Sequence, residues 1–114
     1  MQSNSDRLAL VDELMTRYNA HDAEGYAAMM TEDAVEATYR GAVLRDGREG
    51  VRAGLAAMFA EFPDNRAVVH SRYAVGGKVV LHEEVFRGGT IAPFEVVSIY
   101  SFAGDKVERV EFVR

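Results

Sequence analysis

The chain has 114 residues, of which 48% are apolar and 27% charged, and its net charge is −5 with a pI near 5.1. These values predict one folded domain over residues 1–114. The 13 basic residues are scattered among 18 acidic ones, which argues against nucleic acid or a membrane surface as a partner. The first residues lack the pattern of a secretion signal and the chain has no cysteine, so we expect a cytoplasmic protein.

The first part of the sequence has the spacing of helices. Apolar residues recur every three or four positions from Leu8 to Tyr18, which predicts one face of a helix, and Ser3 with Asp6 forms a capping pair at its start. Asp22 is suited to cap a second, shorter helix that reaches Met30.

A short strand and a third helix follow. Residues 34–39 resemble a strand. Asp46 and Glu49 have the spacing of a capping box, residues 51–62 carry an apolar stripe at helical spacing, and Pro63 ends the helix.

The second half changes to the pattern of β-strands. The pairs Gly76-Gly77 and Gly104-Asp105 are suited to tight turns. The predicted strands span residues 67–75, 78–87, 94–102 and 107–113. Helices followed by an antiparallel meander predict an α+β domain whose helices cover one face of the sheet.

The strand at residues 94–102 is apolar on both faces. Two explanations remain open: the curled sheet covers its own outer face, or a second subunit does. On the second explanation we expect a homodimer through the outer face of the meander, with Val97 and Ile99 at its centre.

The order of elements and several phrases resemble one superfamily. The sequence Tyr18-Asn-Ala-His-Asp22, the segment at residues 29–35, and the closing stretches at residues 93–100 and 105–110 are similar to SnoaL-like proteins, nuclear transport factor 2 and ketosteroid isomerase. The resemblance implies a cystatin-like cone, the nuclear transport factor 2-like roll, in which three N-terminal helices pack on a curved antiparallel meander sheet. It also implies an interior pocket for a hydrophobic small molecule.

The catalytic residues of ketosteroid isomerase are not matched. The positions of its tyrosine, its general-base aspartate and its protonated aspartate fall on Leu14, Thr38 and Ser98. Leucine donates no hydrogen bond, and the hydroxyls are too weakly acidic to replace a carboxylate base. Steroid isomerisation by that mechanism is therefore disfavoured.

Residues 79–86 carry the most informative polar pattern. Strand residues alternate between faces, so Val80, His82 and Glu84 share one side and Glu83 lies on the other. The resemblance places the first set inside the cone, although a one-residue slip would reverse it. We expect His82 and Glu84 to form an acid–base pair in an apolar cavity, with a solvated surface pair as the alternative.

Tyr18 and Glu36 are the other candidate catalytic residues. The Tyr18 hydroxyl is suited to polarise a carbonyl, although a core tyrosine bonded to backbone is an equal alternative. Glu36 is a second candidate base, since it shares a strand face with Thr38. The residues expected to bind substrate are Leu14, Thr38, Met58, Val80, Ser98, Tyr100 and Phe112.

The sequence leaves two functions open. One is a cofactor-free isomerase, dehydratase or cyclase that acts by proton transfer on a hydrophobic carbonyl metabolite. The other is a non-catalytic module of the same fold that binds a small molecule or a protein. The three histidines have no metal-binding spacing, so we expect no metal and no cofactor.

Overall fold

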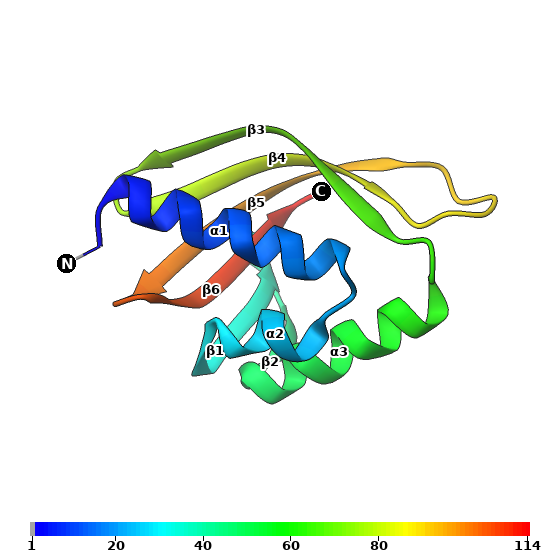
Figure 1. Cartoon of the computed structure of the whole chain (residues 1–114), viewed down its shortest axis with the longest axis horizontal. Helices are drawn as coiled ribbons and strands as arrows, with labels where there is room; N and C mark the ends of the chain where they lie inside the picture. Colours follow the sequence, from blue (N-terminus) through cyan, green and yellow to red (C-terminus); the bar gives the residue numbers. More distant parts are fainter. Residues whose placement is uncertain (1) are drawn as a thin grey trace.

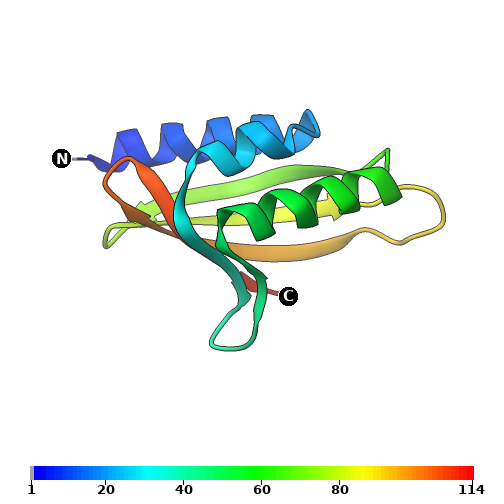
Figure 2. The ribbon, with the colours of Figure 1, turned by 90° about the horizontal axis from the view of Figure 1, so that it is seen from below.

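The computed structural model describes residues 2–114 and has an α+β architecture, in which three helices lie on one side of a curved sheet of six strands (Figure 1). The elements are α1 (Asn4–Asn19), α2 (Ala23–Ala28), β1 (Met30–Thr38), β2 (Val43–Asp46), α3 (Gly47–Glu61), β3 (Arg66–Val75), β4 (Lys78–Phe86), β5 (Phe94–Ala103) and β6 (Lys106–Val113). Figure 2 shows α1 above the long strands and α3 in front of them, whereas the β1–β2 hairpin projects downward, close to the C-terminus.

The sheet has the strand order β2-β1-β6-β5-β4-β3. Strands β3 to β6 form the predicted antiparallel meander, but β1 pairs with β6 in parallel, so the sheet is mixed. The short strand β2 was not predicted. It has only four residues and pairs on one side alone, so it carries too few positions for an alternating pattern.

The helix ends agree with the sequence in part. The capping box of α1 is confirmed: the Asp6 amide donates to the Ser3 hydroxyl and the Ser3 amide donates to the Asp6 carboxylate, both at 3.0 Å. The box predicted for α3 is wrong. Asp46 makes no side-chain capping hydrogen bond, and the Glu49 carboxylate pairs with Arg52 at 2.6 Å. Helix α2 ends before Met30, which begins β1.

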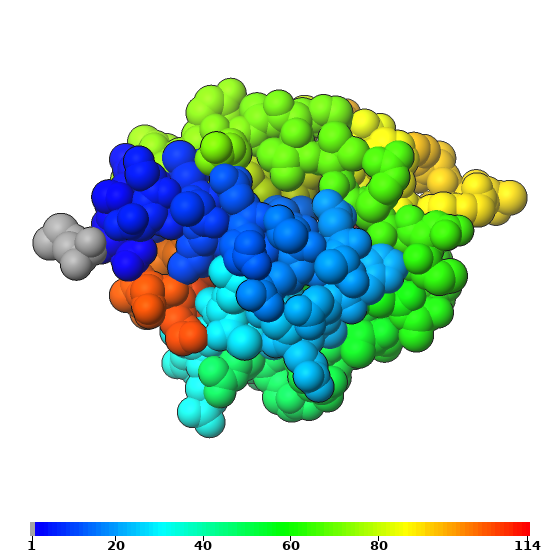
Figure 3. All heavy atoms as spheres, viewed as in Figure 1, coloured from blue at the N-terminus to red at the C-terminus, as the bar shows by residue number. Residues whose placement is uncertain are grey.

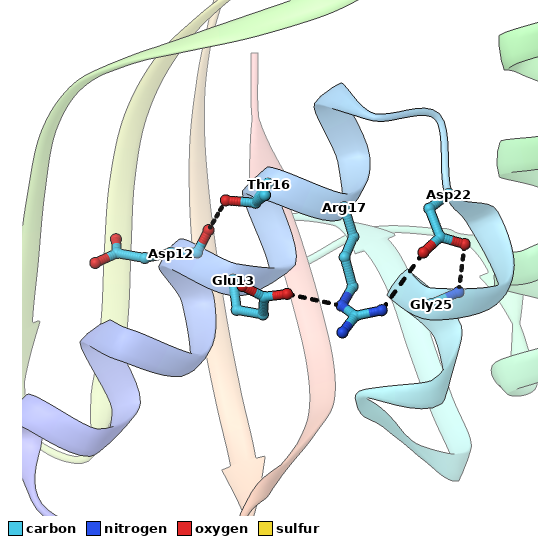
Figure 4. A network of polar contacts seen from close by, with 6 residues as sticks. All are labelled: Asp12, Glu13, Thr16, Arg17, Asp22 and Gly25. Carbon is cyan, nitrogen blue, oxygen red and sulfur yellow. Dashed lines mark hydrogen bonds and ion pairs between the residues drawn. The ribbon is translucent and has the colours of Figure 1, made fainter.

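A polar network fixes the junction between α1 and α2 (Figure 4). The Arg17 guanidinium reaches Glu13 at 3.1 Å and Asp22 at 3.4 Å, and Asp22 accepts from the Gly25 amide at 2.9 Å. This arrangement holds α2 where it buries Tyr26, which is 3% exposed, between the helices and the sheet.

The core lies between the helices and the concave face of the sheet, and helix side chains close over much of that face in Figure 3. In β4 the buried residues alternate with half-buried ones, so the inner face carries Val79, Leu81, Glu83 and Val85. An acidic residue in this otherwise apolar set is therefore part of the interior. Within residues 2–114 no helix has the length and apolar character needed to cross a membrane.

Candidate functional site

A cavity of about 470 Å³ lies between the helices and the sheet. This volume is within the range of small-molecule sites. Its exposed lining residues, Thr38, Leu44 and Arg114, mark the open end. The remaining lining residues are Met15, Tyr18, Tyr26, Glu36, Arg45, Leu55, Met58, Glu83, Val85, Arg87, Phe94, Val96, Tyr100 and Phe112.

Glu83 is the polar group of β4 that lines this cavity, and its side chain is 6% exposed. The Ser98 hydroxyl donates to Glu83 Oε1 at 3.1 Å, while Oε2 has no hydrogen-bond partner among residues 2–114. Burial raises the pKa of the Glu83 carboxyl to about 7, the negative charge of Glu36 adds to the rise, and the Ser98 bond opposes it. At neutral pH this carboxyl is therefore poised between its acid and base forms.

Both oxygens of the second cavity carboxylate, Glu36, have partners. Arg45 Nη1 lies 2.7 Å from Glu36 Oε1, and the Tyr26 hydroxyl donates to Oε2 at 2.9 Å. Burial and the charge of Glu36 raise the pKa of the Tyr26 phenol well above its ordinary value, so the phenol stays protonated. With both oxygens occupied, Glu36 is less available for proton transfer than Glu83.

Tyr18 is oriented by a chain of hydrogen bonds. Arg87 Nη1 donates to Asn65 Oδ1 at 2.7 Å, and Asn65 Nδ2 donates to the Tyr18 hydroxyl at 2.9 Å. Tyr18 thus accepts from Asn65, and among residues 2–114 its own proton has no acceptor. Asn65 is 2% exposed and holds this geometry from inside the protein. The phenolic proton is free to donate to a ligand in the cavity.

The predicted inward placement of His82, Glu84 and Val80 is wrong, because the strand register differs by one residue from the expected one. All three lie on the outer face, opposite the cavity. His82 Nε2 is 2.8 Å from Glu95, and Glu84 is 3.1 Å from His70 Nε2, with half-exposed side chains. Across residues 2–114 no group of three or more such side chains is placed to hold a metal ion.

The other predicted site residues have several locations. Met58, Tyr100 and Phe112 line the cavity together with Tyr18 and Glu36, and Thr38 lies at its open end. Ser98 is fully buried and contacts the cavity through Glu83, whereas Leu14 is fully buried in the core and is not part of the cavity lining.

Sequence reasoning missed Glu83 as a site residue, although a signal for it existed. The set at positions 79, 81, 83 and 85 contains three aliphatic residues and one acid, whereas the set at positions 80, 82, 84 and 86 contains two ionisable groups. The more apolar set belongs inside, and this criterion assigns Glu83 to the interior. Arg45, Arg87 and Arg114 carried no such signal, because they come from three separate segments.

Comparison with known proteins agrees with this architecture. The sequence profile of the SnoaL-like domain family matches residues 11–110, while no curated protein matches the chain. The structure of an uncharacterised cystatin-fold protein from Novosphingobium aromaticivorans is 45% identical, covers 100% of both chains and has a TM-score of 0.93.

Two more distant structures share the fold. A candidate SnoaL-like polyketide cyclase from Jannaschia is 17% identical, with 96% of this chain and 85% of that chain covered and a TM-score of 0.77. The protein TerC, co-crystallised with polyporic acid, is 20% identical, with 95% and 90% covered and a TM-score of 0.76. The profile match over residues 11–110 shows that the chain belongs to the SnoaL-like domain family.

Proposed function

We propose that the protein is a cofactor-free enzyme that catalyses proton transfer on a hydrophobic carbonyl metabolite, as an isomerase, dehydratase or cyclase. The observation that carries this proposal is Glu83, a buried carboxyl in a mostly apolar cavity with one oxygen unpartnered among residues 2–114. Its pKa of about 7 suits a group that must both take and return a proton. Strongly perturbed acids in cavities are typical of active sites.

The chemical step uses the free oxygen of Glu83. Ionised Glu83 removes a proton from the carbon next to the substrate carbonyl, and the C–H electron pair moves toward the carbonyl oxygen to form an enolate. Protonated Glu83 then returns the proton to a different carbon in an isomerisation. In a dehydration the enolate electrons form a C=C bond as the C–O bond breaks, and Glu83 gives its proton to the departing hydroxyl, which leaves as water. In a cyclisation the enolate carbon attacks a second carbonyl, whose C=O π bond breaks, and the resulting alkoxide takes the proton from Glu83.

The enolate oxygen needs a hydrogen-bond donor. Tyr18 meets this need, because Asn65 fixes its oxygen as an acceptor and leaves its proton for the ligand. Tyr100 is a second donor: its hydroxyl lies 3.7 Å from Met15 Sδ, which is a weak acceptor. Burial raises the pKa of the Tyr100 phenol well above its ordinary value, so it keeps its proton. Such donors stabilise charge that develops in the transition state.

The alternative is a binding module of the same fold without chemistry. TerC, crystallised with polyporic acid, supports small-molecule binding in this fold and is compatible with either function. The enzymatic function is favoured because burying the Glu83 carboxyl beside Glu36 destabilises the folded state. A pocket that only binds a ligand does not require such a group.

The test measures both the pKa of Glu83 and the rate of proton exchange on a carbonyl compound. We expect a ¹³C NMR titration to give a Glu83 pKa near 7, and the protein to accelerate hydrogen–deuterium exchange beside the carbonyl of 2-tetralone in D₂O. An ordinary glutamate pKa for Glu83 would contradict the proposal. Binding of 2-tetralone in the cavity without accelerated exchange would favour the binding module.

We also propose a homodimer through the outer face of the meander. Val97 and Ile99 are only half-buried in the isolated chain, and Tyr73 on the neighbouring part of this face is 61% exposed. A second copy would cover these side chains. Ile99→Glu is expected to shift sedimentation toward monomer, and a wild type that is monomeric at every concentration would contradict the proposal.

A further inference from the structure

We infer that the substrate or ligand of this cavity carries an anionic group, most simply a carboxylate, which binds between Arg87 and Arg114 while its hydrophobic carbonyl body enters the cavity. That the ligand is a substrate rests on the proposed function, whereas its charge follows from the arginines alone.

Two guanidinium groups converge on one aromatic ring at the cavity. The Arg87 guanidinium lies 5.3 Å from the centroid of the Phe94 ring and the Arg114 guanidinium lies 3.7 Å from it. Arg87 follows β4 and Arg114 follows β6, so the fold brings them together from separate strands. Two positive charges beside one ring repel each other, and an anion beside both would offset this repulsion.

Neither arginine has a carboxylate partner within residues 2–114. Arg87 uses Nη1 for Asn65 and the Met58 sulfur, and its other N–H groups have no acceptor in the described part of the chain. Arg114 contacts the Phe94 ring and forms no ion pair with any residue from 2 to 113. In a chain whose net charge is −5, arginines without acidic partners at a cavity are suited to bind an anion.

The acidic residues deeper in the cavity do not neutralise the positive charges of Arg87 and Arg114. Glu36 is neutralised by Arg45 at 2.7 Å, and Glu83 is the remaining acid of the lining. Because burial favours the neutral form of Glu83, the lining carries net positive charge at and below neutral pH. The field of the cavity therefore attracts an anion toward the arginines.

The side chains that line the cavity indicate the shape and polarity of the remainder of the ligand. Near the arginines the lining is aromatic and aliphatic, with Phe94, Phe112, Val85 and Val96. An anionic group on a flat hydrophobic skeleton would satisfy the guanidinium groups and pack on these side chains.

The experiment compares 2-naphthoate with 2-naphthamide, which have the same shape and differ in charge. Binding of each is measured by titration calorimetry and amide chemical shifts, at low and high salt. We expect the wild type to bind 2-naphthoate roughly 10- to 100-fold more tightly, because charge-assisted hydrogen bonds to arginine favour the carboxylate. Salt should reduce the preference.

Variants locate the effect. Arg87→Gln is expected to remove most of the preference and Arg114→Gln to reduce it by about 2- to 5-fold, because Arg114 is exposed. The matched control is Arg66→Gln, since Arg66 also lies over a phenylalanine, Phe86 at 4.1 Å, but outside the cavity lining. Because Arg87 also holds Asn65, the Arg114 variant keeps the test valid if Arg87→Gln fails to fold.

Several outcomes would overturn the inference: equal or weaker binding of 2-naphthoate, no binding of either probe, a preference that is unchanged in Arg114→Gln, or one that falls equally in Arg66→Gln. The outcomes that contradict the proposed function are different from these. Without accelerated exchange but with carboxylate preference, the protein would be a binder of aromatic acids. With exchange but no preference, the enzyme would stand and its anionic substrate would not.

Discussion

Glu83 and Glu84 are adjacent in β4, yet they belong to two different regions of the molecule. Glu83 faces the cavity, is 6% exposed and receives one hydrogen bond, from Ser98. Glu84 faces outward, is 31% exposed and lies 3.1 Å from His70. The alternation of a β-strand is the only cause of this difference, because the two side chains are chemically identical.

The polar groups on the two faces also differ in how they are neutralised. On the inner face the Glu36–Arg45 pair has a carboxylate that is 1% exposed, so water contributes little to its stability. On the outer face the His82–Glu95 pair has side chains that are 40% and 69% exposed. Water can therefore replace a lost partner on the outer face but not on the inner one. The two pairs have similar distances, so their different burial determines how much stability is lost when one partner is removed.

The largest expected difference between the faces is in catalysis. Glu83→Gln should reduce the exchange rate on 2-tetralone by about 10²- to 10⁴-fold, because it removes the proton-transfer group and keeps the side-chain shape. Glu84→Gln is the matched control and should leave the rate nearly unchanged. An equal loss in both variants, or none in Glu83→Gln, would show that the cavity carboxyl is not the acid–base group.

Stability should separate the two ion pairs. Arg45→Met leaves Glu36 buried without its cation and is expected to lower the free energy of unfolding by about 3–5 kcal/mol. Glu95→Gln on the outer face should cost less than about 1 kcal/mol. Urea denaturation at neutral pH measures both. Comparable losses in the two variants would mean that Glu36 has access to water in solution.

The pH dependence of folding provides a third difference. The pKa of Glu83 is about 7 in the folded state and 4.5 without the fold. The folded protein therefore holds this proton more tightly, and stability is lost as pH rises from about 4.5 through 7, by about 3 kcal/mol in total. Glu83→Gln should remove this loss and be more stable than wild type at pH 8, whereas Glu84→Gln should keep it. Parallel pH profiles of wild type and Glu83→Gln would contradict the assignment.

The sequence was sufficient for the fold but not for the site. Strong periodicity and turn residues predicted the three helices and the meander, because many positions contribute to each of those signals. Strand β2 and the parallel pairing of β1 with β6 depend on contacts between segments far apart in the chain, which local patterns do not contain.

The prediction of which β4 side chains face the cavity was wrong for a related reason. A shift of one residue in β4 exchanges every side chain between the two faces, so a small error in register replaced Glu83 by His82 and Glu84. Tyr18 and Glu36 do line the cavity. Their positions were inferred from a helix face and from a separate strand, so the error in β4 did not affect them. The partners Arg45 and Asn65 follow only from the three-dimensional arrangement.

The smallest expected effect concerns Ser98, which was predicted to contact the ligand and instead contacts Glu83. Its hydroxyl donates to Glu83 Oε1 at 3.1 Å and holds the carboxyl pKa lower than burial alone would. Ser98→Ala should therefore raise the Glu83 pKa and move the pH dependence of exchange upward by about one pH unit, since the bond favours the ionised carboxylate and a hydrogen bond to a charged group contributes about 1.5 kcal/mol or more. The matched control is Ser101→Ala, because Ser101 lies on the same strand and accepts from Lys78 at 2.8 Å without contacting Glu83. If Ser98→Ala lowered activity at every pH without moving the profile, the serine would act on the substrate or on folding rather than through the acidity of Glu83.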